Sequence, residues 1–304
     1  MIIETKDITK YFQGKLVLDQ INISIPKASI FGLLGPNGAG KTTFIRILTK
    51  IIEADAGEIL FEGKPLLLTD VYQMGYLPEE RGLYKKMGVE EQLLFFASLK
   101  NIPNNQAKKA IKNWAEKFDL ANLLHKPAEE LSKGMQQKVQ LMASLLHAPK
   151  LLILDEPFSG FDPIHAQLLQ DEIVALKQQG TSIILSSHRM ETVEQLCDHL
   201  ALINHGKVIL KGSLNQIQKA YSKQEWILEY EGNKPQNHVL FSCENLQDPF
   251  LKQVSIKPRE GVSLNEILTA LLSQGIVIKS IKEQQPSMNA IFIDAIAQNK
   301  NQYA

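Results

Sequence analysis

The sequence predicts an α/β protein of about two domains, and three observations support this. A buried strand from about Ala28 to Leu34 leads into a glycine-rich loop and then into a helix. A second apolar strand, Leu151 to Leu154, ends in two carboxylates, and a third, from Thr181, ends in Ser-Ser-His. Ligands bind at the carboxyl ends of the strands in open parallel sheets. The chain has 304 residues, 44% of them apolar, which is enough for about two domains with a sizeable core.

The glycine-rich loop is the most specific motif in the chain. The segment Gly35-Pro-Asn-Gly-Ala-Gly-Lys41-Thr42 matches the phosphate-binding pattern G-x-x-x-x-G-K-[ST] at every required position. Its glycines let backbone N–H groups point at phosphate oxygens, and the following helix adds partial positive charge. Lys41 can reach the β- and γ-phosphates, and the Thr42 hydroxyl can bind Mg²⁺. The predicted ATP-binding residues here are Gly35, Asn37, Gly38, Gly40, Lys41, Thr42 and Thr43.

Polar residues at the ends of the two later strands are the candidate catalytic groups. Asp155 suits an acid that holds Mg²⁺ opposite a phosphate loop, as a direct or an outer ligand. Glu156 suits a base or an orienting group for an attacking water molecule. A lone histidine is usually structural, but His188 repeats the placement of Asp155 at a strand end. We therefore assign a function to all three.

Several other residues have an ordinary structural interpretation on spacing alone. Tyr11 and Phe12 lie upstream of the phosphate loop, where an aromatic ring could stack on adenine, but packing is the simpler explanation. Trp114 and Phe118 continue a helical apolar pattern and are predicted to be core residues. Ser132 lies where the N-cap of a helix is expected.

Composition limits the possible functions. The chain has 33 basic and 33 acidic residues, so no general binding of nucleic acid is expected. Its two cysteines, Cys197 and Cys243, lack metal-ligand spacing and suggest reduced thiols in the cytosol. The first residues lack the features of a signal peptide, and no run approaches the ~20 apolar residues that a membrane span requires. A role at a membrane is therefore expected to depend on a partner that holds a soluble subunit.

Taken together, the phosphate loop, the segment Leu131-Ser-Lys-Gly134, the acid pair Asp155-Glu156 and His188 resemble the ATP-binding cassette of ABC transporters. The resemblance covers about residues 1–215. It implies a P-loop NTPase fold: a RecA-like α/β core, an antiparallel β subdomain, and a helical subdomain near residues 86–148. It also implies a cytoplasmic ATPase, peripheral on the inner face of the membrane, that works with separate transmembrane permease subunits.

The resemblance also implies roles for single residues. Two cassettes, expected to be identical chains, would close head to tail around two ATP molecules with Mg²⁺. Ser132 and Gly134 would bind the γ-phosphate held by the other subunit, and Asp162 would lie in the loop that links the two sites. His188 would contact the γ-phosphate and help to arrange the water activated by Glu156. Phe12 occupies the adenine-stacking position better than Tyr11.

The chain departs from the usual family pattern in two places. The common signature is Leu-Ser-Gly-Gly-Gln, but here Lys133 replaces a glycine and Met135 replaces the glutamine. Glu79 stands where the family normally has a glutamine that senses Mg²⁺ and water, and a carboxylate there could still approach the ion. Both departures resemble those of cassettes that serve ABC-2-type exporters, including sodium-efflux and drug-efflux ATPases.

The tail, residues 216–304, is predicted to be a small C-terminal α+β domain. Its expected strands include Trp226–Tyr230, His238–Phe241 and Val254–Ile256, and Ser263-Leu-Asn-Glu266 is a capping box that opens a helix. It resembles the extension found on many export cassettes. Regulation, support of a dimer and contact with a partner all remain open as its role.

Two alternatives to an exporter ATPase remain. A soluble ABC-type ATPase could act on ribosomes, DNA repair or cofactor assembly, but such translation factors usually carry two cassettes and the repair enzymes carry long coiled coils. The altered signature could also mark a cassette that only binds ATP. The intact Lys41, Asp155, Glu156 and His188 argue against this second alternative.

Overall fold

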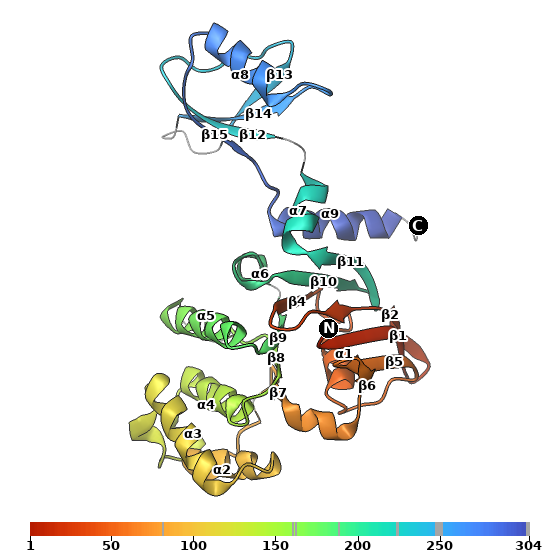
Figure 1. Ribbon diagram of the computed structural model, residues 1–304, viewed down its shortest axis with the longest axis vertical. Coiled ribbons are helices and arrows are strands. Elements are labelled where there is room, and N and C mark those ends of the chain that lie inside the picture. The colour runs from red at the N-terminus through yellow and green to blue at the C-terminus, as the bar shows by residue number, and fades with distance from the viewer. Residues whose placement is uncertain are drawn as a thin grey trace. The chain divides into compact units, whose positions relative to one another are not determined.

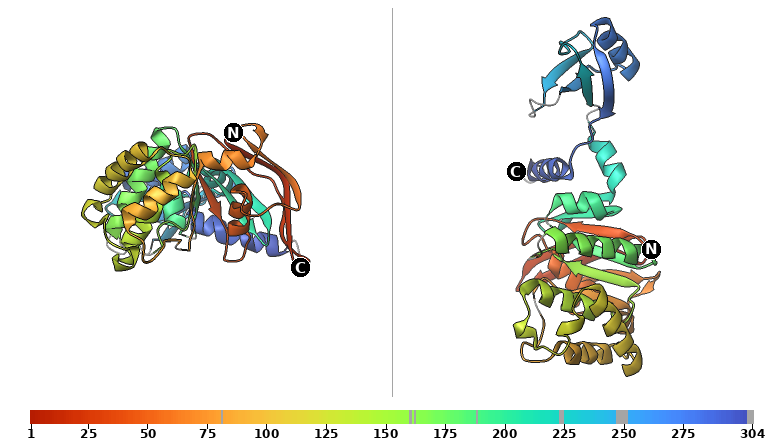
Figure 2. Two further views of the ribbon diagram at one scale, coloured as in Figure 1. Left: turned by 90° about the horizontal axis from the view of Figure 1, so that it is seen from below. Right: turned by 90° about the vertical axis from the view of Figure 1, so that its left-hand side faces the viewer.

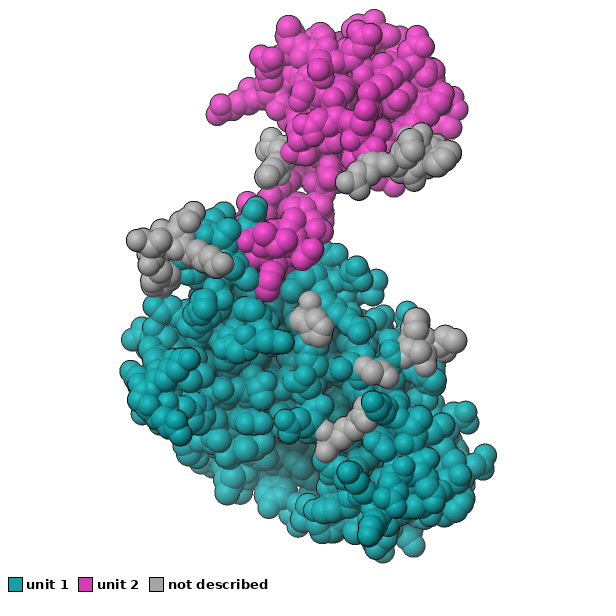
Figure 3. All heavy atoms as spheres, turned by 180° about the vertical axis from the view of Figure 1, so that it is seen from behind, with its two compact units in different colours: residues 1–214, 294–304 teal, residues 215–293 magenta. Residues whose placement is uncertain are grey.

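A computed structural model describes residues 1–80, 82–159, 161, 163–187, 189–222, 225–246 and 252–301 (Figure 1). The chain divides into two compact units, coloured in Figure 3: Met1–Leu214 together with the segment from Asp294, and Asn215–Ile293. The domain boundary near residue 215 and the helical subdomain at residues 86–148 remain predictions from the sequence. None of the helices in the described part of the chain is long and apolar enough to span a membrane.

The centre of the first unit is a six-stranded sheet whose strand order is β11-β10-β4-β9-β8-β7. The strands from β10 to β7 are parallel, and β11 pairs antiparallel with β10 at one edge. The three strands on which the α/β prediction rested all lie side by side here, which confirms the fold class. The strands are β4 (Ile30–Leu34), β7 (Met74–Leu77), β8 (Leu151–Asp155), β9 (Ser182–Ser186), β10 (His199–Asn204) and β11 (Lys207–Ser213).

A second, antiparallel sheet has the order β2-β1-β5-β6, with β3 paired to β1. The strand predicted from Ile21 to Ile25 shows the expected alternation of burial, but it is interrupted at Asn22 and Ile23, so that β2 and β3 pair with β1 as separate strands. At this interruption, the side-chain amide of Asn22 donates to Gln20 O at 2.9 Å and to Asp7 Oδ1 at 2.7 Å. The strands are β1 (Ile3–Phe12), β2 (Lys15–Ile21), β3 (Ser24–Ile25), β5 (Ala56–Phe61) and β6 (Lys64–Pro65).

Helix α1 (Lys41–Leu48) lies between the two sheets (Figure 1). Its apolar side chains, including Phe44 and Ile45, are fully buried in one core with Phe31 and Leu33 of the neighbouring strand. The glycine loop that precedes this helix is therefore held between a buried strand and a buried helix.

On the other side of the six-stranded sheet (Figure 2), α4 (Lys133–Leu145) and α5 (Pro163–Gln178) contact the strands, while α2 (Val89–Leu99) and α3 (Asn104–Lys117) pack against α4. The predicted helical region after Val89 is divided in two at Pro103, which precedes the second helix. A proline fits at the start of a helix because it has no backbone N–H to donate. The helices are α2 (Val89–Leu99), α3 (Asn104–Lys117), α4 (Lys133–Leu145), α5 (Pro163–Gln178) and α6 (Met190–Leu196), with 3₁₀ turns η1 (Leu68–Gln73), η2 (Ala121–Leu123) and η3 (Ala128–Glu130).

The second unit contains an antiparallel sheet of order β13-β14-β12-β15, with α8 packed on one face. The capping box at Ser263 and Glu266 forms as predicted. The predicted strand at His238–Phe241 is wrong: His238 and Phe241 close a tight turn through their backbones, and the strand begins at Phe241. The elements after β11 are α7 (Leu214–Tyr221), β12 (Trp226–Glu231), β13 (Phe241–Asn245), β14 (Gln253–Pro258), α8 (Leu264–Ser273), β15 (Val277–Glu283) and α9 (Met288–Asn301). The part of α9 from Asp294 belongs to the first unit.

Candidate functional site

A cavity of about 640 Å³ opens at the carboxyl ends of the parallel strands in the first unit. The loop after β4, the acids after β8 and the segment after β7 all reach it, as expected for an open parallel sheet. Two residues from the antiparallel sheet complete its wall. The lining residues are Phe12, Val17, Asn37, Gly38, Gly40, Lys41, Thr42, Thr43, Glu79, Asp155 and Glu156.

Two glycines of the loop occupy positions that favour glycine. Gly35 has φ +150°, and a Cβ atom there would lie 2.2 Å from the carbonyl oxygen of Ile203. Gly40 has φ +111°, and its Cβ would lie 2.6 Å from Cδ2 of Leu18. Because L side chains rarely adopt such φ values, the conformation favours glycine at both positions, and at Gly35 the backbone of Ile203 also leaves no room for a Cβ atom.

Lys41 is almost fully buried within the curl of the loop. Its Nζ donates to Gly35 O at 2.7 Å and to Pro36 O at 3.2 Å. Burial lowers the pKa of Lys41, while the carboxylates of Glu156, Asp155 and Glu79 raise it. Among the residues that the structure describes, the other charged groups that line this cavity are all acids: Glu79, Asp155 and Glu156.

Thr42 and Asp155 place two oxygen ligands next to each other. Oγ1 of Thr42 lies 3.4 Å from Oδ2 of Asp155, which is 2% exposed. Hydroxyl and carboxylate oxygens are hard ligands, and Mg²⁺ is usually bound by one or two such protein groups together with substrate phosphates. The donor set therefore fits Mg²⁺.

Glu156 has an unusual backbone conformation, with φ +50°. Its N–H donates to Ser186 O at 3.2 Å and to Ser186 Oγ at 3.1 Å. The left-handed conformation turns the chain sharply directly after the buried strand β8, where Glu156 lines the cavity.

Phe12, rather than Tyr11, lines the cavity. Its ring is 46% exposed, and Nζ of Lys10 lies 5.6 Å from the ring centroid. The backbone N–H of Tyr11 donates to Asp55 Oδ2 at 2.6 Å. An exposed aromatic face beside the phosphate loop is available for stacking on a planar ring.

The structure does not bring every predicted site residue to this cavity. Ser132 and Gly134 lie at the start of α4 and are absent from the cavity lining. Ser132 caps α4 by accepting from Met135 N at 3.3 Å, as predicted. A Cβ atom on Gly134 would lie 3.7 Å from the ring of Phe161. The predicted residues Asp162 and His188 lie outside the described residues.

Sequence analysis missed two residues at the site. Val17 of β2 lines the cavity, but nothing in its local sequence distinguishes it from other strand residues. Ser186 contacts both acids, and its position at the end of an apolar strand was the available signal. The binding and catalytic roles of all these residues stay predictions.

Comparison with known proteins identifies the family. Residues 18–159 match the ABC transporter family, and residues 212–296 match the C-terminal domain of DrrA1-3-like ATP-binding proteins. The chain is 38% identical to the ABC transporter ATP-binding protein YhaQ of Bacillus subtilis, over 95% of this chain and 96% of that protein. It is 31% identical to the lantibiotic transport ATP-binding protein SrtF of Streptococcus pyogenes, over 85% of this chain and 100% of that protein.

Solved structures agree with the sequence comparisons. The structure of an ATP-binding subunit of an ABC transporter superimposes with a TM-score of 0.68 and 30% sequence identity. The match covers 73% of this chain and 93% of that chain. The P-loop NTPase core predicted from the sequence is therefore confirmed. The chain belongs to the ATP-binding subunits of ABC transporters, and it carries a DrrA-like C-terminal domain.

Proposed function

We propose that this chain binds ATP with Mg²⁺ and hydrolyses it to drive an ABC exporter. One observation carries the proposal: Lys41 and Thr42 of the phosphate loop share a single cavity with Asp155 and Glu156. The loop's N–H groups and Lys41 would hold the phosphates, and Phe12 would stack on the adenine.

Hydrolysis would use the acid at the end of β8. Glu156 would orient a water molecule and accept its proton as the water oxygen attacks the γ-phosphorus, releasing ADP and phosphate. Thr42 and Asp155 would hold Mg²⁺, which supplies positive charge to the phosphates when it is bound. His188 would contact the γ-phosphate.

A second cassette, expected to be an identical chain, would complete the site. Ser132 and Gly134 lie outside the chain's own cavity, so they are available to reach the γ-phosphate held by a partner. The side chain of Gln137 donates to Pro157 O at 2.7 Å and ties α4 to the loop after Glu156. This bond would link the two sites, as would Asp162.

Separate transmembrane permease subunits would hold the chain at the cytoplasmic face of the membrane. The surface from Glu79 to Met87 and the adjoining helices would make the contact. It includes a cluster of three aromatic rings: the centroid of Tyr84 lies 5.8 Å from that of Phe95 and 6.2 Å from that of Phe96. An apolar cleft of about 360 Å³, lined partly by Phe96 and Leu99, adjoins the cluster.

Export is proposed from the resemblance of the chain to ABC-2-type cassettes and from its relatives. The relative from Streptococcus pyogenes serves lantibiotic transport, and the C-terminal region matches DrrA-like proteins. The comparisons do not favour the alternative of a soluble ATPase acting on ribosomes, DNA repair or cofactor assembly.

Isolation of the tagged chain from gently solubilised membranes tests this proposal. We expect a multi-span protein in stoichiometric amount, identified by mass spectrometry. Tyr84→Ser, at a side chain in the exposed aromatic cluster, should reduce recovery of that companion without changing ATP affinity. Recovery of ribosomal or repair proteins, with no membrane companion, would instead support the alternative.

ATP binding has its own test in the phosphate loop. Lys41→Ala should weaken ATP affinity at least tenfold in calorimetry, because a cation beside the phosphates is lost. Lys50→Ala, just after the other end of α1, is the matched control and should bind like the parent protein. Unchanged affinity in Lys41→Ala would show that the loop does not hold phosphate.

A further inference from the structure

Ser186 is a fully buried polar residue at the carboxyl end of β9. In the sheet, β9 lies between β4, which leads into the phosphate loop, and β8, which ends at Asp155. Ser186 pairs in register with Asp155 across the two parallel strands. Ser186 therefore lies at the carboxyl ends of the parallel strands, where the nucleotide cavity opens.

The hydroxyl of Ser186 contacts both acids. Its Oγ donates to Oδ1 of Asp155 and accepts from the backbone N–H of Glu156 at 3.1 Å. A hydroxyl group can do both at once, because it has one proton and two lone pairs. The carbonyl oxygen of Ser186 accepts from the same N–H at 3.2 Å.

The first bond orients the carboxylate of Asp155. With Oδ1 held by Ser186, Oδ2 is the oxygen that lies 3.4 Å from Oγ1 of Thr42. These two oxygens are the ones that would hold Mg²⁺. Without the serine hydroxyl, the carboxylate of Asp155 could rotate about its Cβ–Cγ bond. The oxygen that faces Thr42 could then turn away from it.

The second bond holds the backbone of Glu156. Its φ of +50° is disfavoured for a residue with a Cβ atom, so the surrounding contacts must maintain it. Both acceptors of its N–H belong to Ser186. Loss of the hydroxyl removes the shorter of these two bonds, at 3.1 Å.

We propose that Ser186 is a positioning residue that sets the Mg²⁺-binding carboxylate of Asp155 and the backbone of Glu156 together. The inference rests on the proposed binding of Mg²⁺ and ATP. A serine that merely satisfied buried polar groups would affect stability alone. A positioning residue should also affect how strongly Mg²⁺ promotes the binding and turnover of ATP.

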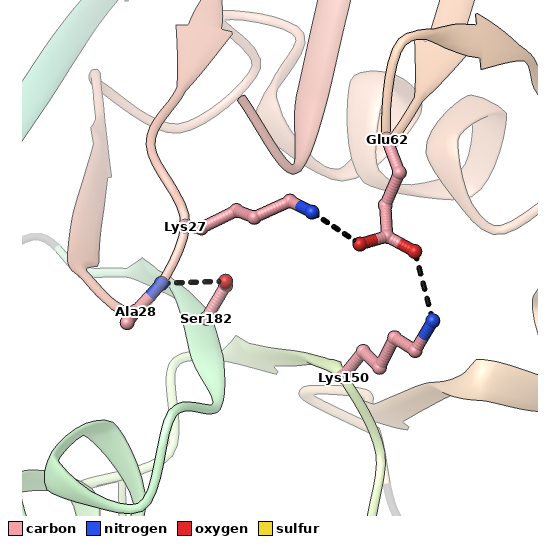
Figure 4. A network of polar contacts seen from close by, with 5 residues as sticks. All are labelled: Lys27, Ala28, Glu62, Lys150 and Ser182. Carbon is pink, nitrogen blue, oxygen red and sulfur yellow. Dashed lines mark hydrogen bonds and ion pairs between the residues drawn. The ribbon is translucent and has the colours of Figure 1, made fainter.

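The same strand supplies a matched control. Ser182, at the opposite end of β9, is also buried and accepts from the backbone N–H of Ala28 at 3.0 Å (Figure 4). Ser182→Ala removes a hydroxyl from the same strand far from the nucleotide cavity. It therefore reports the effect of lost hydrogen bonding on stability alone.

The test compares ATP affinity in excess EDTA with ATP affinity in Mg²⁺, by calorimetry, for the parent protein and each variant. In Ser186→Ala, ATP affinity in EDTA should stay within about twofold of the parent value. The Mg²⁺ concentration that gives half of the maximal increase in ATP affinity should rise about 10- to 100-fold, as is typical when a partner of a metal ligand is lost. Turnover at saturating ATP should fall by a similar factor. Ser186→Thr keeps a hydroxyl and should restore both values.

Several results would overturn the proposal. One is that ATP affinity in Ser186→Ala depends on Mg²⁺ as it does in the parent protein. Another is that Ser182→Ala changes this dependence equally. A third is that folded Ser186→Thr restores neither the Mg²⁺ dependence nor the turnover. If Ser186→Ala does not fold, Ser186→Cys retains a side chain of similar size with a weaker donor, and should show the same shift in smaller measure. If the parent protein binds ATP with Mg²⁺ but does not hydrolyse it, the proposed hydrolysis fails, whereas the binding comparison still tests Ser186.

Discussion

Oε2 of Glu62 lies 2.8 Å from Nζ of Lys150, although 88 positions separate them in the sequence (Figure 4). The other carboxylate oxygen of Glu62 pairs with Nζ of Lys27. Glu62 follows β5 in the antiparallel sheet, while the two lysines precede β8 and β4 of the six-stranded sheet. The three residues therefore link the two sheets at the amino ends of the parallel strands, whereas the nucleotide cavity opens at their carboxyl ends.

This link predicts a pH-dependent stability. Hydrogen bonds from Lys150 and then Lys27 lower the pKa of Glu62 from 4.5 to about 2. A carboxyl group with a lowered pKa stabilises the fold fully above its unfolded value and loses that contribution as pH falls through its folded value. We expect the parent protein's advantage in melting temperature over Glu62→Gln to be largest above pH 4.5 and to disappear between pH 4.5 and about 2.

The control for that measurement is Glu58→Gln, which removes the exposed ion pair between Glu58 and Lys6. Exposed pairs contribute little, so its melting temperature should follow the parent curve at every pH. A constant difference between Glu62→Gln and the parent protein across the whole range would contradict the role of ionised Glu62.

Glu156→Gln should separate ATP binding from hydrolysis. The amide keeps the shape of the side chain but cannot accept a proton, so turnover should fall by about 10²- to 10⁴-fold. ATP affinity should change little, and a cassette dimer should accumulate with ATP in size-exclusion chromatography. Hydrolysis at the parental rate would show that another group is the base.

Glu79→Gln should show the effect of the extra carboxylate in the cavity. Glu79 raises the pKa of Lys41 and lines the same cavity. Removing its charge reduces repulsion of the phosphates, so affinity for metal-free ATP should increase about fivefold at low salt, equivalent to about 1 kcal/mol. The gain should shrink in 0.5 M salt, because ions screen the charge. An affinity that is lower, or equal at all salt concentrations, would refute this.

Ser263→Ala should destabilise the second unit alone. Ser263 Oγ accepts from Glu266 N at 3.4 Å, and Glu266 Oε2 accepts from Ser263 N at 2.8 Å. Loss of a helix N-cap costs about 1 kcal/mol. Hydrogen exchange should accelerate in α8 and its sheet, while ATP affinity stays at the parental value. Ser273→Ala, at the last turn of α8, removes a hydroxyl that donates to Ala270 O, and it should have a smaller effect because that carbonyl oxygen also accepts from Gln274 N.

Local patterns were sufficient wherever neighbouring residues decide the structure. The glycine loop, the apolar strands β4, β8 and β9, and the capping box at Ser263 were all predictable because each depends on residues within one short segment. The errors arose where a distant contact decides. The strand predicted across Asn22 is interrupted at that residue, whose side chain bonds to Asp7 in another strand, and such a partner cannot be found from periodicity.

The sequence by itself thus predicted the chemistry of the site, because the residue types expected to bind phosphate and Mg²⁺ occur in short local motifs. Tertiary structure alone decided which of those residues meet in one cavity. It placed Val17 of β2 on the cavity wall, where nothing in the local sequence distinguishes this residue. It also joined Ser186 to Asp155 through the register of two parallel strands, a relationship between segments 31 positions apart that no local pattern encodes.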